Sequence, residues 1–164
     1  FDTVGSTEAS NTATITTEKG DLVIELYPKE APLAVNSFVY LAREGFYDGI
    51  TFHRVMHDFV AQTGDPSGTG ISGSGYEYRE ETSDALTFDQ PYMVGVARAN
   101  TAGTSGSQFF ITYVPYGSLN GQYTIFGKLI AGQDVLANIT ERDTSTNPEA
   151  ATGDKILSIT IKEN

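Results

Sequence analysis

The stretch FHRVMHDFVAQTGD, residues 52–65, places a charged side chain among large apolar ones. Arg54 lies between Phe52 and Val55, and Phe59 and Gln62 follow within the same run. Arginine stays protonated and presents a planar fork of donors, so an arginine enclosed by apolar groups can donate strong, oriented hydrogen bonds to a ligand. The other interpretation is an arginine at a strand edge that extends its charged end into water. The run alone leaves both interpretations open.

Three further patterns have a possible chemical meaning, and each is weaker. His53 and His57 are spaced as H-x-x-x-H, but the zinc-protease motif needs a glutamate directly after the first histidine, where this chain has Arg54. Residues 68–73 fit G-x-G-x-x-G but do not stand between a strand and a helix, which favours a surface loop. The serines of residues 102–110 lack the spacing of a nucleophile elbow. A metal-dependent hydrolase built on the two histidines remains a hypothesis, which elemental analysis for zinc would test.

Two later stretches supply more candidate residues, namely VGVARANTAGTSGSQFFIT (94–112) and GSLNGQYTIFGKL (117–129). Taken with residues 52–65, they resemble the cyclophilin family of peptidyl-prolyl cis-trans isomerases. The resemblance runs from about residue 12 to the C-terminus, and the F-H-R, G-S-Q-F-F-I and F-G-K motifs follow in the family's order. It implies an isomerase that acts on X-Pro bonds in peptides and unfolded proteins, as a monomer and without a cofactor. A second hypothesis is a binding or chaperone module that uses the same groove with little turnover.

The resemblance also implies roles for individual residues. Arg54 matches the catalytic arginine, which hydrogen-bonds the prolyl nitrogen while the bond is twisted, and Gln62 matches the glutamine that orients it. The other matched positions are expected to bind substrate: Phe59, Val60 and Phe110 in the proline pocket, Leu119 and Tyr123 at its rim, and Gly68, Ala99, Asn100 and Gln108 along the adjoining groove.

Without the resemblance, several aromatic side chains have a simpler interpretation. Phe59 and Phe110 would be core residues, and Tyr123 an exposed aromatic at a strand end. Alternation along the strands places Phe52, Val55 and Phe109 in the core under either interpretation.

The chain departs from the best-known eukaryotic pattern at three of these positions. Ser118 stands where those members have tryptophan, Val60 where they have methionine, and Tyr123 where they have histidine. A tyrosine at that rim position resembles the bacterial-type members. The family's groove takes cyclosporin, and we expect Ser118 to weaken that binding, because the tryptophan supplies contact area and an indole donor.

Short strands and few helices must position these residues. Residues 14–27 alternate in polarity around Lys19-Gly20-Asp21, which predicts a hairpin. A helix is expected from Pro32 to Gly45, with Leu33, Phe38, Leu41 and Ala42 on its apolar face, and a short one over 132–139. Further strands are expected over 51–56, 59–63, 92–98, 108–114, 123–130 and 155–161. This order predicts a mainly β fold, a closed eight-stranded antiparallel barrel capped by two α-helices, which is also the family's fold.

Composition limits the possible partners and compartments. The chain has 164 residues, no cysteine, and 21 acidic against 10 basic residues, for a net charge of −11. A surface this acidic repels nucleic acid and anionic membranes, and no stretch is apolar enough to span a membrane. Residues 1–11 are expected to be a flexible linker or a processed segment, and 12–164 a single domain. The polar, Ser/Thr-rich start favours an extracytoplasmic protein, secreted or tethered upstream.

Overall fold

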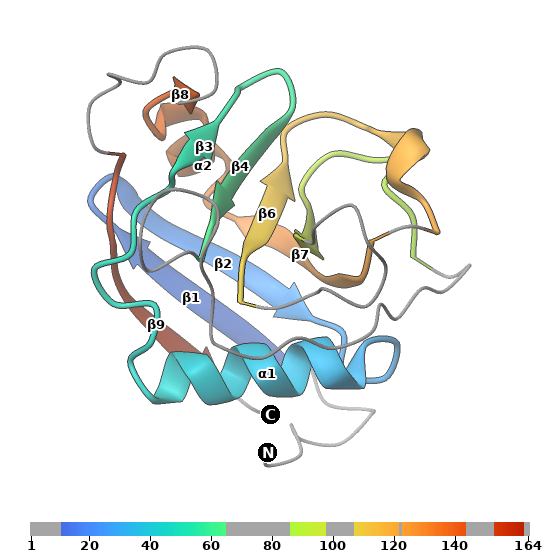
Figure 1. Ribbon diagram of the computed structural model, residues 1–164, viewed down its shortest axis with the longest axis horizontal. Helices are drawn as coiled ribbons and strands as arrows, with labels where there is room; N and C mark the ends of the chain where they lie inside the picture. The colour runs from blue at the N-terminus through green and yellow to red at the C-terminus, as the bar shows by residue number, and fades with distance from the viewer. Residues whose placement is uncertain (1–10, 65–85, 98–106, 122, 144–152, 163–164) are drawn as a thin grey trace.

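The structure is a computed structural model that describes residues 11–64, 86–97, 107–121, 123–143 and 153–162. Within them, one antiparallel sheet curls around a core, and α1 lies across one end of it (Figure 1). The strands are β1 (Asn11–Thr17), β2 (Gly20–Leu26), β3 (Arg54–Val55), β4 (Val60–Thr63), β5 (Met93–Val96), β6 (Phe109–Thr112), β7 (Ile125–Ala131), β8 (Arg142–Asp143) and β9 (Ile156–Lys162). The helices are α1 (Pro32–Arg43), α2 (Gln133–Asn138) and the 3₁₀ turn η1 (Gly117–Leu119).

The strand order in the sheet is β8-β3-β4-β6-β5-β7-β2-β1-β9. The predicted fold class is confirmed, although "closed" slightly overstates it. Among the described residues, the segment before β3 meets the start of β9 through backbone hydrogen bonds, in which Gly49 N–H donates to Ile156 O (2.7 Å) and Phe52 N–H to Asp154 O (2.9 Å), and through an isolated bridge between Thr51 and Lys155. The sheet has nine strands in place of the expected eight, because β8 forms a separate short strand. Two residues are too few to show a period in the sequence.

The β1–β2 hairpin forms as predicted, with its alternating apolar residues inside. Ile15, Leu22 and Ile24 are fully buried. The turn lies one residue earlier than expected, because Gly20 already pairs with Thr17 as the first residue of β2. Gly20 has a φ of +132°, which a residue with a side chain rarely adopts.

Helix α1 begins at Pro32 and is followed by Gly45 with a φ of +75°, so the predicted start and stop are both confirmed. Phe38, Leu41 and Ala42 are buried as expected, whereas Leu33 is only half-buried. The predicted short helix corresponds to α2, and each of the six predicted strand ranges contains a strand whose ends differ by a few residues.

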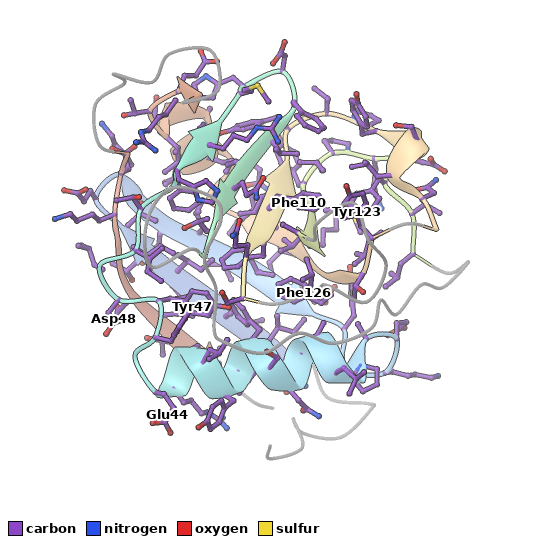
Figure 2. All side chains as sticks on the ribbon, viewed as in Figure 1. Glu44, Tyr47, Asp48, Phe110, Tyr123 and Phe126 are labelled. Carbon is purple, nitrogen blue, oxygen red and sulfur yellow. The ribbon has the colours of Figure 1, made fainter. Side chains whose placement is uncertain are left out.

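Aromatic rings fill the space between α1 and the sheet. Phe38 of α1 meets Tyr47, Phe109 and Phe126 at centroid distances of 5.2–5.5 Å. Tyr47 and Phe126 lie beside α1 in Figure 2. Tyr47 also donates its hydroxyl to Ser107 O at 3.0 Å, so this main core is tied to the residues that lead into β6. Phe52, Val55 and Phe109 belong to it, which confirms their predicted core positions.

We expect Phe38→Ala to lower the free energy of unfolding by about 3–5 kcal/mol, because it leaves a cavity among three aromatic rings. Tyr40→Ala is the matched control, since Tyr40 lies on the same helix but is 44% exposed. Urea denaturation measures both variants. A loss for Phe38→Ala no larger than that for Tyr40→Ala would contradict this account of the core.

Candidate active site

The pairing of three strands places the predicted catalytic residues on one face of the sheet. Arg54 of β3 lies opposite Gln62 of β4, and Gln62 lies opposite Phe110 of β6. Residues directly opposite each other on paired strands share a face. The neighbouring row, Val55 and Ala61, points into the main core and is buried. The sheet therefore separates Arg54 from that core.

Apolar side chains on the same face as Arg54 form a second cluster, distinct from the main core. Its buried members are Val60, Phe88, Met93, Phe110 and Ile125, and its partly buried members are Tyr27, Phe59, Leu86, Ala97, Leu119 and Tyr123. We call these residues the pocket cluster. All five residues expected to line the proline pocket and its rim are among them.

The rings of the pocket cluster contact one another edge to face or stacked. Phe110 meets Tyr123 in a T-shaped contact at 5.8 Å and stacks on Phe88 at 5.7 Å. Figure 2 shows Phe110 and Tyr123 side by side, at a distance from α1. Phe59 meets Tyr116 at 4.8 Å. Such contacts fix the rings relative to one another and give the cluster a defined shape.

Arg54 lies at the border of the pocket cluster. Its side chain is half-buried, and Cζ lies 5.6 Å from the centroid of the Phe59 ring, within the range of a cation–π contact. A tight turn makes this possible, since Met56 N–H donates to Val60 O (2.9 Å) and Phe59 N–H to Met56 O (2.8 Å). The turn folds Phe59 back over the arginine that precedes it in sequence.

Two glutamines lie next to the arginine. Gln62 Nε2 donates to Gln108 Oε1 at 3.0 Å, so a hydrogen bond joins the side-chain amide of a β4 residue to that of the residue before β6. Gln108 is anchored in turn, because its carbonyl accepts a hydrogen bond from Ala97 N–H at 2.8 Å. The structure thus brings Arg54, Gln62 and Gln108 together. The orientation of Arg54 by Gln62 stays a prediction.

The other predicted groove residues have different outcomes. Leu119 is in η1 and packs on the pocket cluster, next to the exposed Ser118. Gly68, Ala99 and Asn100 lie outside the described residues.

Sequence reasoning missed the buried base of the pocket cluster. Phe88 is fully buried, yet it lies in LTFDQPY, which has no strand or helix period. Tertiary contacts hold it, since its N–H donates to Asn120 Oδ1 (2.6 Å) and its carbonyl accepts from Tyr116 N–H (2.7 Å). The strands expected over 92–98 and 123–130 include Met93 and Ile125, but the sequence did not indicate which cluster these two residues would join.

Tyr27 is a partly buried member of the pocket cluster, and its surroundings shift the pKa of its phenol. Burial raises the pKa of its phenol to about 12, assisted by the carboxylates of Glu25 and Glu30. The phenol therefore stays neutral well above physiological pH.

Two features of the described part of the chain bear on metal binding and on membrane insertion. It contains no group of three or more His, Asp or Glu side chains placed to hold a metal ion. None of its helices has the length and apolar character needed to cross a membrane.

The curled antiparallel sheet carries Arg54 at the border of an apolar cluster separate from the core, and comparison with known proteins identifies the family. Residues 12–161 match the model of the family described as cyclophilin type peptidyl-prolyl cis-trans isomerase/CLD. The chain belongs to this family.

Several relatives are similar over most of the chain. It is 41% identical to peptidyl-prolyl cis-trans isomerase A of Mycobacterium tuberculosis over 170 residues, which cover 93% of both chains. It is 38% identical to the mouse peptidylprolyl isomerase domain and WD repeat-containing protein 1, covering 96% of this chain but only 25% of that much longer protein. A solved cyclophilin-type isomerase of Cryptosporidium parvum has a TM-score of 0.85 and 36% identity, with 94% and 99% of the two chains covered. The same protein in the presence of the dipeptide Ala-Pro gives a TM-score of 0.84.

Gly95 leaves room for the Phe110 ring. The two residues are cross-strand neighbours, and a Cβ on Gly95 would lie 2.6 Å from Phe110 Cζ. We expect Gly95→Ala to push the ring off its place and to cost roughly 1–3 kcal/mol of stability. Aromatic NMR shifts of Phe110 and Tyr123, with urea denaturation, measure the displacement and the cost.

Gly127→Ala is the matched control, because a Cβ there would be equally crowded but against Ile24 and the Glu25 backbone, away from Phe110. It should lower stability without changing the Phe110 and Tyr123 shifts. Equal shift changes in both variants would show that Gly95 has no special relation to the pocket cluster.

Proposed function

We propose that this chain is a prolyl isomerase that accelerates rotation about X-Pro bonds in peptides and unfolded proteins, as a monomer and without a cofactor. The observation that carries the proposal is the position of Arg54, half-buried at the border of an apolar cluster that is separate from the core. Membership of the family supports it, as does the relative described with the dipeptide Ala-Pro.

The chemistry requires no covalent step. Amide resonance opposes rotation with a barrier of roughly 18–20 kcal/mol, and the enzyme must bind the twisted bond better than either planar form. In the twisted state the prolyl nitrogen becomes pyramidal and its lone pair becomes an acceptor. A guanidinium aimed at that nitrogen then donates a hydrogen bond that scarcely exists in the ground state.

The surrounding side chains suit this role. Phe59, Val60 and Phe110 offer an apolar surface for the proline ring, with Leu119 and Tyr123 at its rim. An apolar surrounding excludes water, and the charge-assisted hydrogen bond gains strength as water leaves. The Gln62–Gln108 pair supplies amide groups for the peptide backbone and a fixed neighbour for the guanidinium.

Three more residues belong to this proposal. As the matched family positions imply, Gly68, Ala99 and Asn100 contribute to binding the peptide.

We expect Arg54→Ala to lower kcat/KM by roughly 100- to 1000-fold, the loss typical of removing one transition-state donor. Arg54→Lys should recover only part of it, because an ammonium keeps the charge but not the planar fork. Exchange NMR on a short Ala-Pro peptide measures the rate of cis–trans exchange directly.

The control for this experiment is Arg43→Ala, which removes the same charge from the exposed end of α1. It should leave exchange unchanged, and thermal melting should show all three variants folded. Full activity in Arg54→Ala would refute the mechanism. A wild-type protein that shifts peptide resonances without accelerating exchange would be a binding module instead.

Ser118 provides a test of drug binding. It is exposed beside Leu119, where a tryptophan could cover part of a bound cyclic peptide. We expect Ser118→Trp to tighten cyclosporin binding about tenfold, since a buried aromatic contact contributes on the order of 1 kcal/mol beyond its area. The native chain has no tryptophan, so fluorescence of the new indole reports binding directly. Calorimetry on the wild type gives the reference affinity, and equal affinities would refute the role of this position.

A further inference from the structure

The segment that follows α2 runs along β3, the strand that carries Arg54. We call residues 139–143 the strap. Its β8 part pairs with β3, with Arg54 opposite Asp143 and Val55 opposite Arg142. Arg142 Nη1 also donates to His53 O at 2.9 Å. The strap therefore borders β3 on the side opposite β4.

His57 links the turn between β3 and β4 to the strap. Its Nε2 lies 2.6 Å from Ile139 O, its backbone N–H donates to Glu141 Oε2 (3.3 Å), and its Nδ1 lies 3.6 Å from Glu141 Oε1. A carbonyl oxygen only accepts, so Nε2 must carry a proton. The opposite nitrogen faces a carboxylate, which also only accepts. Only the doubly protonated imidazolium satisfies both contacts.

Tyr113 connects this histidine to the pocket cluster. Its ring lies 5.1 Å from the His57 ring, and its N–H donates to Phe59 O at 2.9 Å. Its hydroxyl donates to Leu136 O at 2.8 Å, near the end of α2. Burial, and then the Glu141 and Asp154 carboxylates, raise the pKa of this phenol, so it remains a donor. His57 thus packs between the strap and the residue that holds the Phe59 backbone.

We propose that His57 is a positioning residue that couples the strap to Arg54 and Phe59. The inference rests on the proposed isomerase function, because it concerns where that site's residues lie. His57 is distinct from the groups assigned to substrate.

Charged and titratable groups surround His57 on several elements. Glu141 faces the ring from the strap, Tyr113 packs on it, and Asp58 adjoins it in the turn. Asp154 accepts hydrogen bonds from Thr140 in the strap, and Arg142 donates to His53 O. Glu141 is the strap residue whose side chain contacts His57 directly, through the backbone N–H and Nδ1 of the histidine.

NMR of variants tests the coupling without relying on activity. In the ¹⁵N-labelled protein, the amide and guanidinium resonances of Arg54 are compared among the wild type, His57→Gln, Glu141→Gln and Glu18→Gln. We expect the Arg54 resonances to shift in His57→Gln and Glu141→Gln, which disturb the contact between the turn and the strap, and to stay in place in Glu18→Gln. Arg54 resonances that do not move in the first two variants, or that move equally in Glu18→Gln, would refute the coupling.

Kinetics test the consequence for the site. We expect His57→Gln and Glu141→Gln to lower kcat roughly three- to thirtyfold with little change in KM, the size of loss that small misplacement of a catalytic group causes. The matched control is Glu18→Gln, an identical charge change at an exposed contact where Glu18 Oε1 accepts from Lys155 N–H at 2.8 Å.

The outcomes separate this inference from the proposed function. Unchanged kcat in both variants would overturn the positioning role. So would a loss of kcat that comes with a raised KM and a lower melting temperature, since it would mark a merely structural contact. A wild-type protein that does not accelerate exchange would refute the isomerase proposal, and the NMR comparison would still decide the coupling.

Discussion

The register of three paired strands is the constraint on which the rest of this site depends. Arg54, Gln62 and Phe110 share one face because β3, β4 and β6 pair in one alignment. Side chains alternate between faces along a strand, so a slip of one residue would turn Arg54 into the main core and bring Val55 to the pocket. Burying an unpaired charge is costly, and that cost specifies the register strongly.

The same strands build two apolar regions with different uses. Toward α1, Phe109 and its neighbours close-pack around Phe38 and exclude water. On the opposite face, Phe110 is the central ring of the pocket cluster. Adjacent residues of β6 therefore belong to the main core and to the pocket cluster, so one strand joins the two apolar regions. Gly95 allows this arrangement, because only a residue without a side chain leaves space for the Phe110 ring.

Segments from distant parts of the chain support the arginine on both sides. β4 and the Gln62–Gln108 pair lie on one side of β3, and the strap lies on the other. The bond from Arg142 to His53 spans 89 residues of sequence. Contacts of this kind explain how a strand of two residues, too short to be stable alone, can hold the Arg54 side chain in place.

The amino-acid sequence by itself determined most of the elements and the family. Alternation revealed the hairpin and the main strands, Pro32 and Gly45 bounded α1, and the motif around Arg54 indicated the family. Only the tertiary structure decided which apolar residues form the main core and which the pocket cluster, since the strands expected over 92–98 and 123–130 do not show what Met93 and Ile125 pack against. It also added Phe88, β8 and the His57–Glu141 contact. These arise from pairings between remote segments, and local propensity carries no information about pairings that depend on how the whole sheet curls.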